Sequence, residues 1–511
     1  MEERNLPIKL IMQKSEDSVN NKGRGGTKFF CDVTDQLKDS IISSFSEISS
    51  YYENLFQENE RVPAVGVITV KPEAIAKSHK PNDLCRKCPI IGSEELGEIY
   101  IKVSKKSIAE TIELIKNPPS QKFSANLTAI SKIQPVKAEN KISQSLIKIQ
   151  QAGNFDMIKN AIKIKLFDFQ DDFDNEQILN YVMSKLSEMG YADSHQIITY
   201  GEDIKFIKIA INSYDDIVNI SSINGVKTID FFQEYSLPIT DMSKDKIDKL
   251  VDVSGGDSEV VIGIIDGGIG NDILDEMVEK DRLIAKALLI HSARMNYREL
   301  IDNDPNNIKY YGFGMPFNDT KNVLQCTKSE ITMIFKQKIV QGTHLEMMDF
   351  PYPKSLIKDG KCYGEIGMTL VYNPSLDENY GREYCRANID ASFGMYKYDG
   401  ANLSYSGCVP LECAWDEKYE KARVENGFKW SPIKSYYRKI KQGISMGDGW
   451  KVRIDLNARN ETNIPEQEFV LVITIRDPGG NDIYTEVTNS LREKGYITND
   501  LKTRYQIRQR G

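Results

Sequence analysis

The sequence predicts a multidomain protein of mixed α+β and α/β class, and three patterns lead to this prediction. Residues 162–232 alternate strand-like and helical stretches in the order β-α-β-β-α-β, residues 330–476 contain strand-like runs with period-two alternation, and residues 35–57 carry apolar side chains at helical spacing. A chain of 511 residues with 40% apolar side chains is long enough for three or four domains of roughly 100–200 residues each.

Residues 1–60 are predicted to form a polar arm followed by a helix. The arm runs into Gly23-Arg24-Gly25-Gly26, a cluster typical of a flexible arm or turn. It lacks the Gly-Lys-Ser/Thr that completes a phosphate-binding loop. The apolar residues of 35–57 favour an amphipathic helix whose stripe packs against a core, with a partner surface as the alternative (Leu37, Ile41, Ile42, Phe45, Ile48, Tyr52, Leu55).

Two α/β units are expected next. Residues 61–150 alternate short β-branched runs with helical stretches, which predicts a small α/β unit. Residues 155–240 contain the β-α-β-β-α-β order of the split βαβ, or ferredoxin-like, arrangement. That fold hosts many functions, so it decides none by itself.

Charge and hydropathy limit the classes of partner. The chain has 66 basic and 74 acidic residues, a net charge of -8, and no long basic block that would neutralise a phosphate backbone. The first nine residues are charged and have no apolar core of the kind that a secretory signal needs, and no stretch is apolar over about 18 residues. We therefore expect a cytoplasmic protein that binds neither nucleic acid nor membrane.

The eight cysteines are too dilute for a disulfide framework. Cys85 and Cys88 form the one C-x-x-C, and His79 is the only histidine near them. A loop with two reduced thiols is therefore preferred over a zinc site. We expect no metal and no cofactor.

The clearest chemical motif is a strand that ends in an aspartate. Residues 259–272 read EVVIGIIDGGIGND, an apolar run followed by Asp266 and two glycines. Such a run is typical of a buried parallel strand, and its carboxyl end is where open α/β sheets place their ligands. A strand cap with a glycine turn is the alternative interpretation.

This strand resembles the aspartate motif of the subtilisin-like serine peptidases (subtilases), with Asp266 at the position of the triad aspartate. Two other features fit the resemblance. The β-α-β-β-α-β unit lies where subtilases carry a propeptide, and residues 283–294 (LIAKALLIHSAR) with Tyr311-Gly312-Phe313-Gly314 resemble the helix and turn that close the catalytic domain. The whole chain is similar to large cytoplasmic bacterial subtilases with long extensions at both ends.

The other two members of the triad are missing from the sequence. A triad needs an imidazole to take the serine proton and a carboxylate to orient that imidazole. Neither the His-Gly-Thr-His helix nor the Gly-Thr-Ser-x-Ala-x-Pro helix of the family is present. Each remaining candidate has an argument against it. His79 and His195 precede the aspartate strand, and His291 and Ser292 are helix neighbours that point apart. His344 lies in a strand-like run in which Gln341 occupies the position of the catalytic imidazole, and Ser392 lacks the flanking motif.

Chain length supports the same conclusion. Between Asp266 and Tyr311 lie 44 residues (267–310), whereas each βαβ unit takes about 30 residues and a complete parallel sheet takes several such units. Residues 255–320 are therefore expected to form a subtilase core that is truncated internally near Asn271, retaining only a remnant of the parallel sheet.

The C-terminal part is predicted to be mostly strands. Alternation such as Val452, Ile454 and Leu456 with polar residues between them marks half-buried antiparallel strands, so residues 321–490 are expected to form a β-sandwich or jelly roll. Asp377 and Glu378 are expected to be solvated loop charges rather than calcium ligands. Residues 491–511 are expected to form a polar tail without fixed structure.

The resemblance implies a serine-type endopeptidase from which activity has been lost. The leading hypothesis is a silent homologue that binds a peptide or a partner protein; its propeptide-like unit would then be suited to inhibit an intact relative. The alternative is an endopeptidase whose site is completed in trans by another chain, and a third possibility is a chain without function. The family also implies an ATPase of the AAA class as a partner.

Overall fold

The computed structural model describes most of the chain, in two compact units. The sandwich unit comprises Met1–Arg24, Glu259–Asp377 and Cys385–Gly511, and the α/β unit comprises Gly25–Ser258 and Glu378–Tyr384. The protein is thus a multidomain chain of mixed helix and sheet, as the sequence predicts. The described residues are 5–12, 16–20, 28–76, 80–155, 158, 161–191, 195–200, 204–232, 273–296, 298–317, 319–415, 420–425, 428–459, 464 and 466–501.

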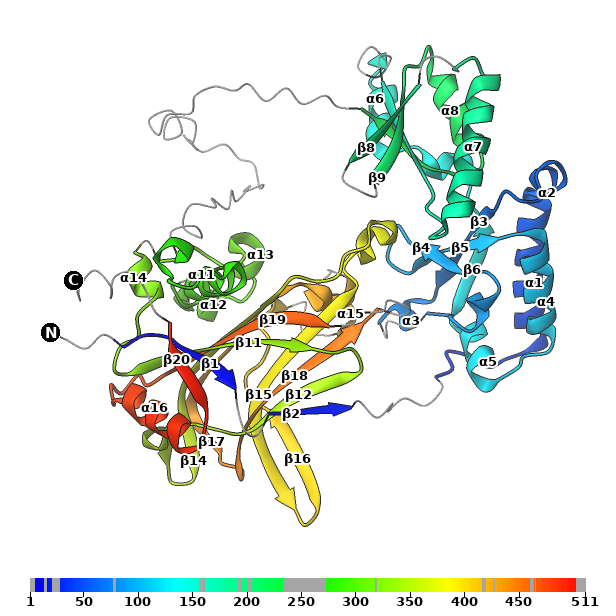
Figure 1. Cartoon of the computed structure of the whole chain (residues 1–511). Helices are drawn as coiled ribbons and strands as arrows, with labels where there is room; N and C mark the ends of the chain where they lie inside the picture. Colours follow the sequence, from blue (N-terminus) through cyan, green and yellow to red (C-terminus); the bar gives the residue numbers. More distant parts are fainter. Residues whose placement is uncertain are drawn as a thin grey trace, which may run out of the picture. The chain divides into compact units, whose positions relative to one another are not determined.

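The first sheet of the sandwich unit has seven strands (Figure 1). They follow the order β13-β14-β19-β11-β1-β20, with β17 also paired to β14. Only the β1–β11 pair is parallel among these pairings. The strands are β1 (Ile8–Met12), β11 (Glu330–Ile339), β13 (Ile357–Lys358), β14 (Lys361–Tyr372), β17 (Ile433–Ser445), β19 (Gln467–Arg476) and β20 (Ile497–Asp500).

The second sheet of this unit has five antiparallel strands in the order β16-β15-β18-β12-β2. Apolar side chains from the two sheets share one core, to which helix α16 (Ile483–Glu493) also contributes. The two sheets therefore form a β-sandwich. The strands are β2 (Glu16–Asn20), β12 (Thr343–Phe350), β15 (Ala387–Asp399), β16 (Asn402–Gly407) and β18 (Gly449–Ala458).

Alternation along the strands explains the sandwich. Val452, Ile454 and Leu456 of β18 are buried in the core, whereas Arg453 and Asp455 between them pair with each other on the other face. Because side chains alternate between the faces of a strand, this period-two pattern fixes which face is buried. Each buried valine, isoleucine or leucine contributes about 1.5–3 kcal/mol.

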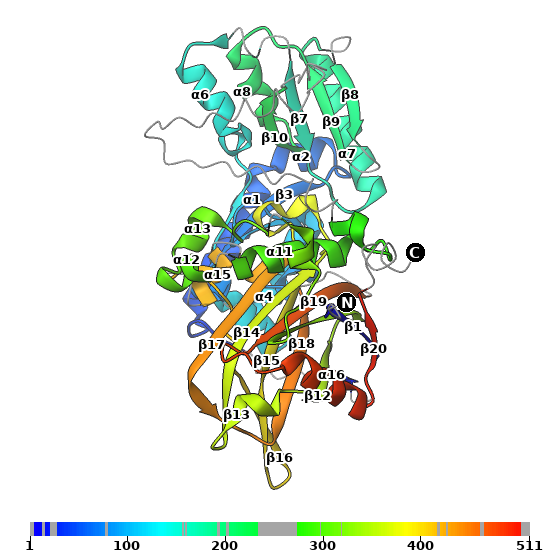
Figure 2. The same ribbon diagram turned by 90° about the vertical axis from the view of Figure 1, so that its left-hand side faces the viewer.

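Helix α11 (Arg282–Asn296) covers the outer face of the first sheet, and α12 (Arg298–Asn303) and α13 (Asn307–Tyr311) lie beside it (Figure 2). Helix α14 (Thr320–Val323) also contacts α11. The longest helix, α11, packs Ile284, Ala287 and Leu288 against the sheet residues Val470 and Val472. The sandwich unit thus has three layers: helices, first sheet, second sheet.

One side of the sandwich is closed by side chains rather than by strand pairing. Lys434 of β17 is fully buried, and its Nζ donates to Asn388 Oδ1 (2.5 Å), to the carbonyl of Ile389 (2.8 Å) and to Asp390. The hydroxyl of Tyr436 accepts a hydrogen bond from the Ala391 N–H (3.0 Å). These contacts satisfy main-chain groups of β15 along part of its length.

The α/β unit contains two four-stranded antiparallel sheets. The first has the order β4-β5-β3-β6 and is covered by α1, whose Ile41, Phe45 and Ile48 are buried, as the amphipathic pattern predicts. Its elements are α1 (Asp35–Tyr51), α2 (Glu53–Glu58), β3 (Ala64–Val70), α3 (Pro72–Ala76), η1 (Leu84–Arg86), β4 (Ile90–Gly92), β5 (Glu98–Val103), α4 (Lys105–Lys116), α5 (Gln121–Thr128) and β6 (Ile130–Pro135).

The second sheet of the α/β unit has the β-α-β-β-α-β element order that the sequence predicts, and its strand order is β10-β7-β9-β8. Asp171 and Ser213 cap the two helices through hydrogen bonds to main-chain N–H groups. The elements are η2 (Ala138–Lys141), α6 (Gln144–Gln151), β7 (Ile162–Leu166), α7 (Asp172–Glu188), β8 (His195–Tyr200), β9 (Ile204–Ile209), α8 (Tyr214–Ser222) and β10 (Val226–Phe231).

Residues Glu378–Tyr384, which lie between β14 and β15 in the chain, belong to the α/β unit and contain η5 (Glu378–Glu383). Asn379 accepts a hydrogen bond from the Ser93 N–H through its carbonyl (2.9 Å), and its side-chain amide donates to Asp168 (2.8 Å). Glu378 forms an ion pair with Lys165 (3.2 Å). Glu378 is therefore not simply a solvated loop charge, as the sequence suggested, but a partly exposed member of an ion pair.

The structure groups some predicted segments differently. Strands β1 and β2 lie in what is predicted as an N-terminal arm, and β20 lies in the predicted unstructured tail; β1 pairs with both β11 and β20. The described part of residues 255–320 consists of helices on the sandwich rather than a separate core. Long-range pairing orders these short segments, and local sequence patterns do not report it.

Candidate functional site

Asp266, the candidate catalytic carboxylate, lies outside the described residues together with the whole of residues 259–272, and so does His79. The other candidates lie on different elements. His195 is in β8, where its Nδ1 is 3.1 Å from the carbonyl oxygen of Tyr191. His291 is on α11, His344 on β12 and Ser392 on β15.

His291 lies in a buried polar layer between α11 and the first sheet. Its Nδ1 is 2.9 Å from Thr369 Oγ1, and its Nε2 is 2.8 Å from Thr474 Oγ1, which in turn is 2.7 Å from Thr332 Oγ1. Burial, together with the nearby charge of Arg476, lowers the pKa of His291 to about 4, and the charge of Glu412 opposes part of this shift. A neutral imidazole has one donor and one acceptor, so both ring nitrogens are satisfied by hydroxyl groups.

Next to His291, a buried carboxylate joins two arginines of the helical layer to the sheet. Glu412 Oε2 accepts from Arg294 Nε (3.1 Å) and from the Ser435 hydroxyl (2.6 Å), and Oε1 accepts from Arg298 (2.5 Å). Burial alone would raise the pKa of Glu412, but the charges of Arg294 and Arg298 and their hydrogen bonds hold it below its usual value. Glu412 is therefore a fixed anion.

The same network holds the turn that follows α13. Arg294 donates to the carbonyl oxygen of Gly312 (3.0 Å), and the N–H of Gly314 donates to the carbonyl of Tyr311 (2.9 Å). Gly312 and Gly314 have φ of 56° and 87°, a region that favours glycine. The Tyr-Gly-Phe-Gly sequence is thus a tight turn tied to the buried ion pairs.

An open depression of about 750 Å³ lies beside this network. Its ionisable side chains are balanced: Arg298, Lys439 and Arg476 against Glu299, Asp302 and Glu365. Ion pairs join Lys439 to Glu365 (2.5 Å) and Arg298 to Asp302 (3.1 Å). Both charge signs suit a zwitterionic or peptide-like ligand better than a polyanion. The lining residues are Met295, Asn296, Arg298, Glu299, Leu300, Asp302, Asn303, Phe317, Glu365, Tyr437, Lys439 and Arg476.

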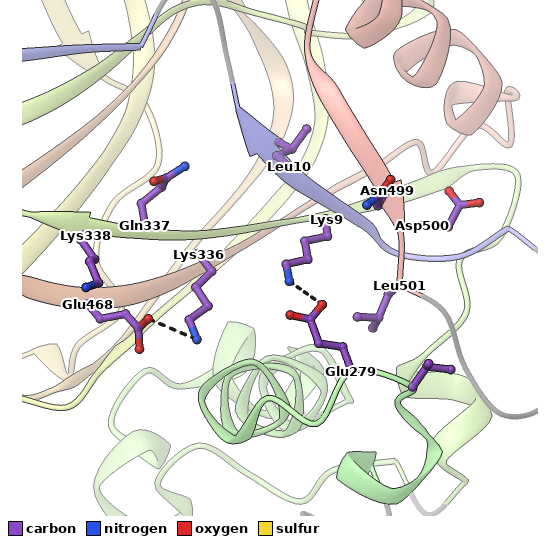
Figure 3. Close-up of a pocket in the computed structure, with 11 residues that line it drawn as sticks. Lys9, Leu10, Glu279, Lys336, Gln337, Lys338, Glu468, Asn499, Asp500 and Leu501 are labelled. Atoms are coloured by element: carbon purple, nitrogen blue, oxygen red, sulfur yellow. Dashed lines mark hydrogen bonds and ion pairs between the residues drawn. The ribbon is translucent and has the colours of Figure 1, made fainter.

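A second depression, of about 700 Å³, lies at the other end of the first sheet (Figure 3). Lys9 of β1 and Lys336 of β11 extend toward acidic partners, with Lys9 Nζ 2.7 Å from Glu279 and Lys336 Nζ 3.2 Å from Glu468. Lys336 also pairs with Asp281 (2.6 Å). It too combines both charge signs.

Ser392 and His344 lie on the same face of the second sheet with β18 between them, so two strand spacings, roughly 10 Å, separate their strands. The Ser392 hydroxyl bonds to Tyr405 (2.8 Å), and His344 Nε2 is 3.4 Å from Glu346. Lys451 pairs with Glu346 (2.8 Å). The serine and the imidazole therefore have different partners.

Cys85 and Cys88 are buried free thiols. The sulfur of Cys88 lies 3.5 Å from Ser107 Oγ and 3.4 Å from Thr111 Oγ1, and burial raises the pKa of the Cys88 thiol. Among the described residues, no three His, Cys, Asp or Glu side chains lie together in a group able to hold a metal ion. A raised thiol pKa favours the neutral form, which binds metals poorly.

The buried ion-pair network could not be read from the sequence. Arg294 lies near the end of α11 and Arg298 begins α12, so the two arginines are four positions apart in the sequence, a spacing that is usual for solvent-facing charges. Their common partner, Glu412, lies in a loop more than 100 positions later, beyond the reach of any local pattern. The only local signal is the placement of two arginines on the face next to His291.

Compared with known protein families and with curated proteins, the sequence gives no match. Within the described ranges, no helix has the length and apolar character needed to cross a bilayer.

Proposed function

We propose that this chain is a catalytically silent homologue of the subtilisin-like serine peptidases and that it binds a peptide or a partner protein. In this proposal, Asp266 is a triad aspartate without its histidine and serine. The β10-β7-β9-β8 sheet would be the propeptide-like, ferredoxin-like unit, and residues 255–320 would retain a remnant of the peptidase core.

One observation carries the proposal. His291 has both ring nitrogens bonded to threonine hydroxyls in a buried layer, and its pKa is lowered to about 4. Such an imidazole has no free nitrogen with which to take a serine proton near neutral pH. Ser392, the candidate nucleophile considered from the sequence, instead bonds to Tyr405.

The balanced charges of the 750 Å³ depression support peptide binding. An extended polypeptide offers N–H donors, C=O acceptors and side chains of either charge, so it can exchange bonds with Lys439, Glu365 and Arg476. We take this depression as the candidate peptide site.

The test combines binding with the absence of cleavage. Fluorescein-labelled casein should show raised fluorescence polarisation with the full chain, no fragments after long incubation, and no fluorophosphonate labelling of any serine. Lys439→Ala should weaken binding several-fold, whereas Lys441→Ala, two residues along the same strand and outside the depression, should not. Casein cleavage by the purified chain would overturn the proposal.

The alternative is a serine endopeptidase completed in trans. Another chain would then supply a histidine and a serine beside Asp266. The discriminating measurement is fluorophosphonate labelling of this chain mixed with candidate partners, including an ATPase of the AAA class, which the family resemblance implies as a partner. Labelling that requires both the partner and Asp266 would favour this alternative over a silent homologue.

A narrower version of the leading proposal is inhibition of an intact relative by the propeptide-like unit. It predicts that the full chain slows an active subtilisin-like peptidase in a dose-dependent way. Unchanged peptidase activity at a large excess of the chain would count against inhibition and leave peptide binding to be judged by the casein experiment. A chain without function would instead fail to melt cooperatively as a monodisperse sample.

A further inference from the structure

The hairpin formed by β15 and β16 presents an exposed sheet edge. β16 pairs with β15 and is a terminal strand of its sheet among the strands that the structure describes, and in Figure 1 this hairpin projects beyond the neighbouring strands. Leu403 is 42% exposed and lies opposite Tyr398, which is 53% exposed. A terminal strand offers unpaired N–H and C=O groups to another chain.

This edge lacks the features that usually prevent such pairing. β16 reads Asn-Leu-Ser-Tyr-Ser-Gly, with no charged residue and no proline. The other terminal strands described in the sandwich unit carry charge: β2 has Glu16 and Asp17, β20 has Asp500, β13 has Lys358, and β17 has several lysines. Charged side chains and proline are the common protection of sheet edges, so β16 stands out as unprotected.

The turn fixes which groups face outward. Gly400 (φ 59°) and Ala401 form a two-residue turn between the paired residues Asp399 and Asn402, which makes these two a hydrogen-bonded pair. Alternation then directs the N–H and C=O groups of Leu403 and Tyr405 away from β15.

Tyr398, opposite Leu403, fits this assignment. Its N–H donates to Asp448 (2.7 Å) on the side of β15 away from β16. The Tyr398–Leu403 pair is therefore one that does not exchange main-chain hydrogen bonds, as the alternation requires.

The outward groups of β16 are complementary to those of a second β16. In an antiparallel pair with Ser404 on the two-fold axis, Leu403 of each copy lies opposite Tyr405 of the other. The N–H and C=O groups of both residues point away from β15, so the two Leu403–Tyr405 pairs form four main-chain hydrogen bonds between the copies. Each of these residue pairs also places an aliphatic side chain next to an aromatic one. A charged residue near the axis would face the same residue of the second copy and be repelled by it, and β16 has no charged residue.

We propose that β16 pairs with β16 of a second copy of this chain, forming a two-fold dimer in which the second sheet continues across both copies. This inference does not rest on the proposed peptide binding. A contact made by six-residue strands is small, so the dimer is reversible and forms as concentration rises.

The test introduces a charge of either sign at Ser404, the residue on the two-fold axis, and measures dimerisation by sedimentation velocity at chain concentrations from about 1 µM to about 500 µM. The wild-type chain should shift from monomer to dimer across this range. Ser404→Lys and Ser404→Glu, each alone, should weaken dimerisation at least tenfold, because like charges face each other across the axis. An equimolar mixture of the two variants should restore the dimer. Asn489→Lys, on the exposed part of α16, serves as the control and should leave the dimer unchanged.

Three outcomes would overturn the proposal: a wild-type chain that stays monomeric throughout, a Ser404→Lys variant that dimerises like the wild type, or a mixture that stays monomeric. Restoration in the mixture also excludes misfolding as the reason that each variant alone is monomeric. A monomeric chain that instead binds an added uncharged peptide along β16 would likewise show that the second copy is the wrong occupant.

Discussion

The two halves of helix α11 rest on the first sheet in different ways. In the first half, Ile284, Ala287 and Leu288 pack on valines of the sheet, whereas in the second half His291 and Arg294 bond to threonines and to a buried glutamate. The first half of α11 is held by burial of apolar surface, and such contacts are non-directional and therefore tolerate small shifts of the helix. The second half is held by directional bonds whose loss leaves polar groups buried and unpaired, and the 750 Å³ depression lies beside it.

Glu412→Ala should give the largest effect. It leaves Arg294, which is 3% exposed, without its counter-ion, and loss of one partner of a buried ion pair costs about 3–5 kcal/mol. The free energy of unfolding from urea titration checks this. Glu412→Gln, which keeps the shape and one acceptor oxygen, should lose less. Equal losses for the two variants would indicate that packing, rather than charge, holds the second half.

Leu288→Ala probes the first half. The side chain is 2% exposed in the cluster under α11, and removal of a buried leucine to alanine costs about 2–5 kcal/mol depending on how far the site collapses. The same urea titration measures it. The loss caused by Leu288→Ala should not depend on salt concentration, because the substitution leaves no buried charge without a partner. The loss caused by Glu412→Ala should depend on it. A strong salt dependence would contradict the division of the helix into two kinds of contact.

His291 should make stability fall as the pH falls. Its folded pKa of about 4 lies below the unfolded value of 6.5, so the unfolded chain binds the proton more readily. The contribution is fully present above pH 6.5 and is lost progressively toward pH 4, by about 3 kcal/mol in total. Unfolding titrations between pH 7 and pH 5 test this, before most carboxylates titrate. In His291→Gln, which keeps a donor and an acceptor but does not titrate, the slope over this range should become flatter.

Ser292→Ala should have the smallest effect, below about 1 kcal/mol. The Ser292 hydroxyl donates only to the carbonyl oxygen of Leu289 on the same helix (2.8 Å), a group that the helix itself can satisfy. Thermal melting measures the change. The variant should also bind fluorescein-casein as the wild type does. Loss of binding would indicate that this serine contacts the ligand, contrary to its place beside the satisfied His291.

Much of the regular structure was predictable because it follows local periodicity. The helix predicted at 283–294 spans Arg282–Asn296, and the strand-like runs predicted within residues 330–476 correspond to β11, β12, β14, β15, β18 and β19. Strand β17 was not predicted, because Lys434 and Arg438 share its inward face with Tyr436 and break the apolar alternation. Strand β1 was missed because its register, with Ile8 opposite Met333, depends on residues far along the chain.

The candidate site was predictable only in part. The sequence indicated that His291 and Ser292 would not form a catalytic pair, and the structure gives them different partners. It gave no indication of the threonines that bond His291, because Thr369 and Thr474 read as ordinary strand residues. Whether Asp266 has the role that its motif implies stays a prediction, since that residue lies outside the described ranges.

The docked segment Glu378–Tyr384 determines how this protein can be divided for experiments. It completes the α/β unit: Tyr380 is 6% exposed in the core of that unit, and Ser93 donates its N–H to the carbonyl of Asn379 and its hydroxyl to the carbonyl of Tyr380. Yet the segment is encoded between two strands of the sandwich. A recombinant fragment of residues 25–258 would therefore lack a piece of its own core. Adding residues 378–384 as a synthetic peptide, or fusing them through a linker, would be needed to supply it.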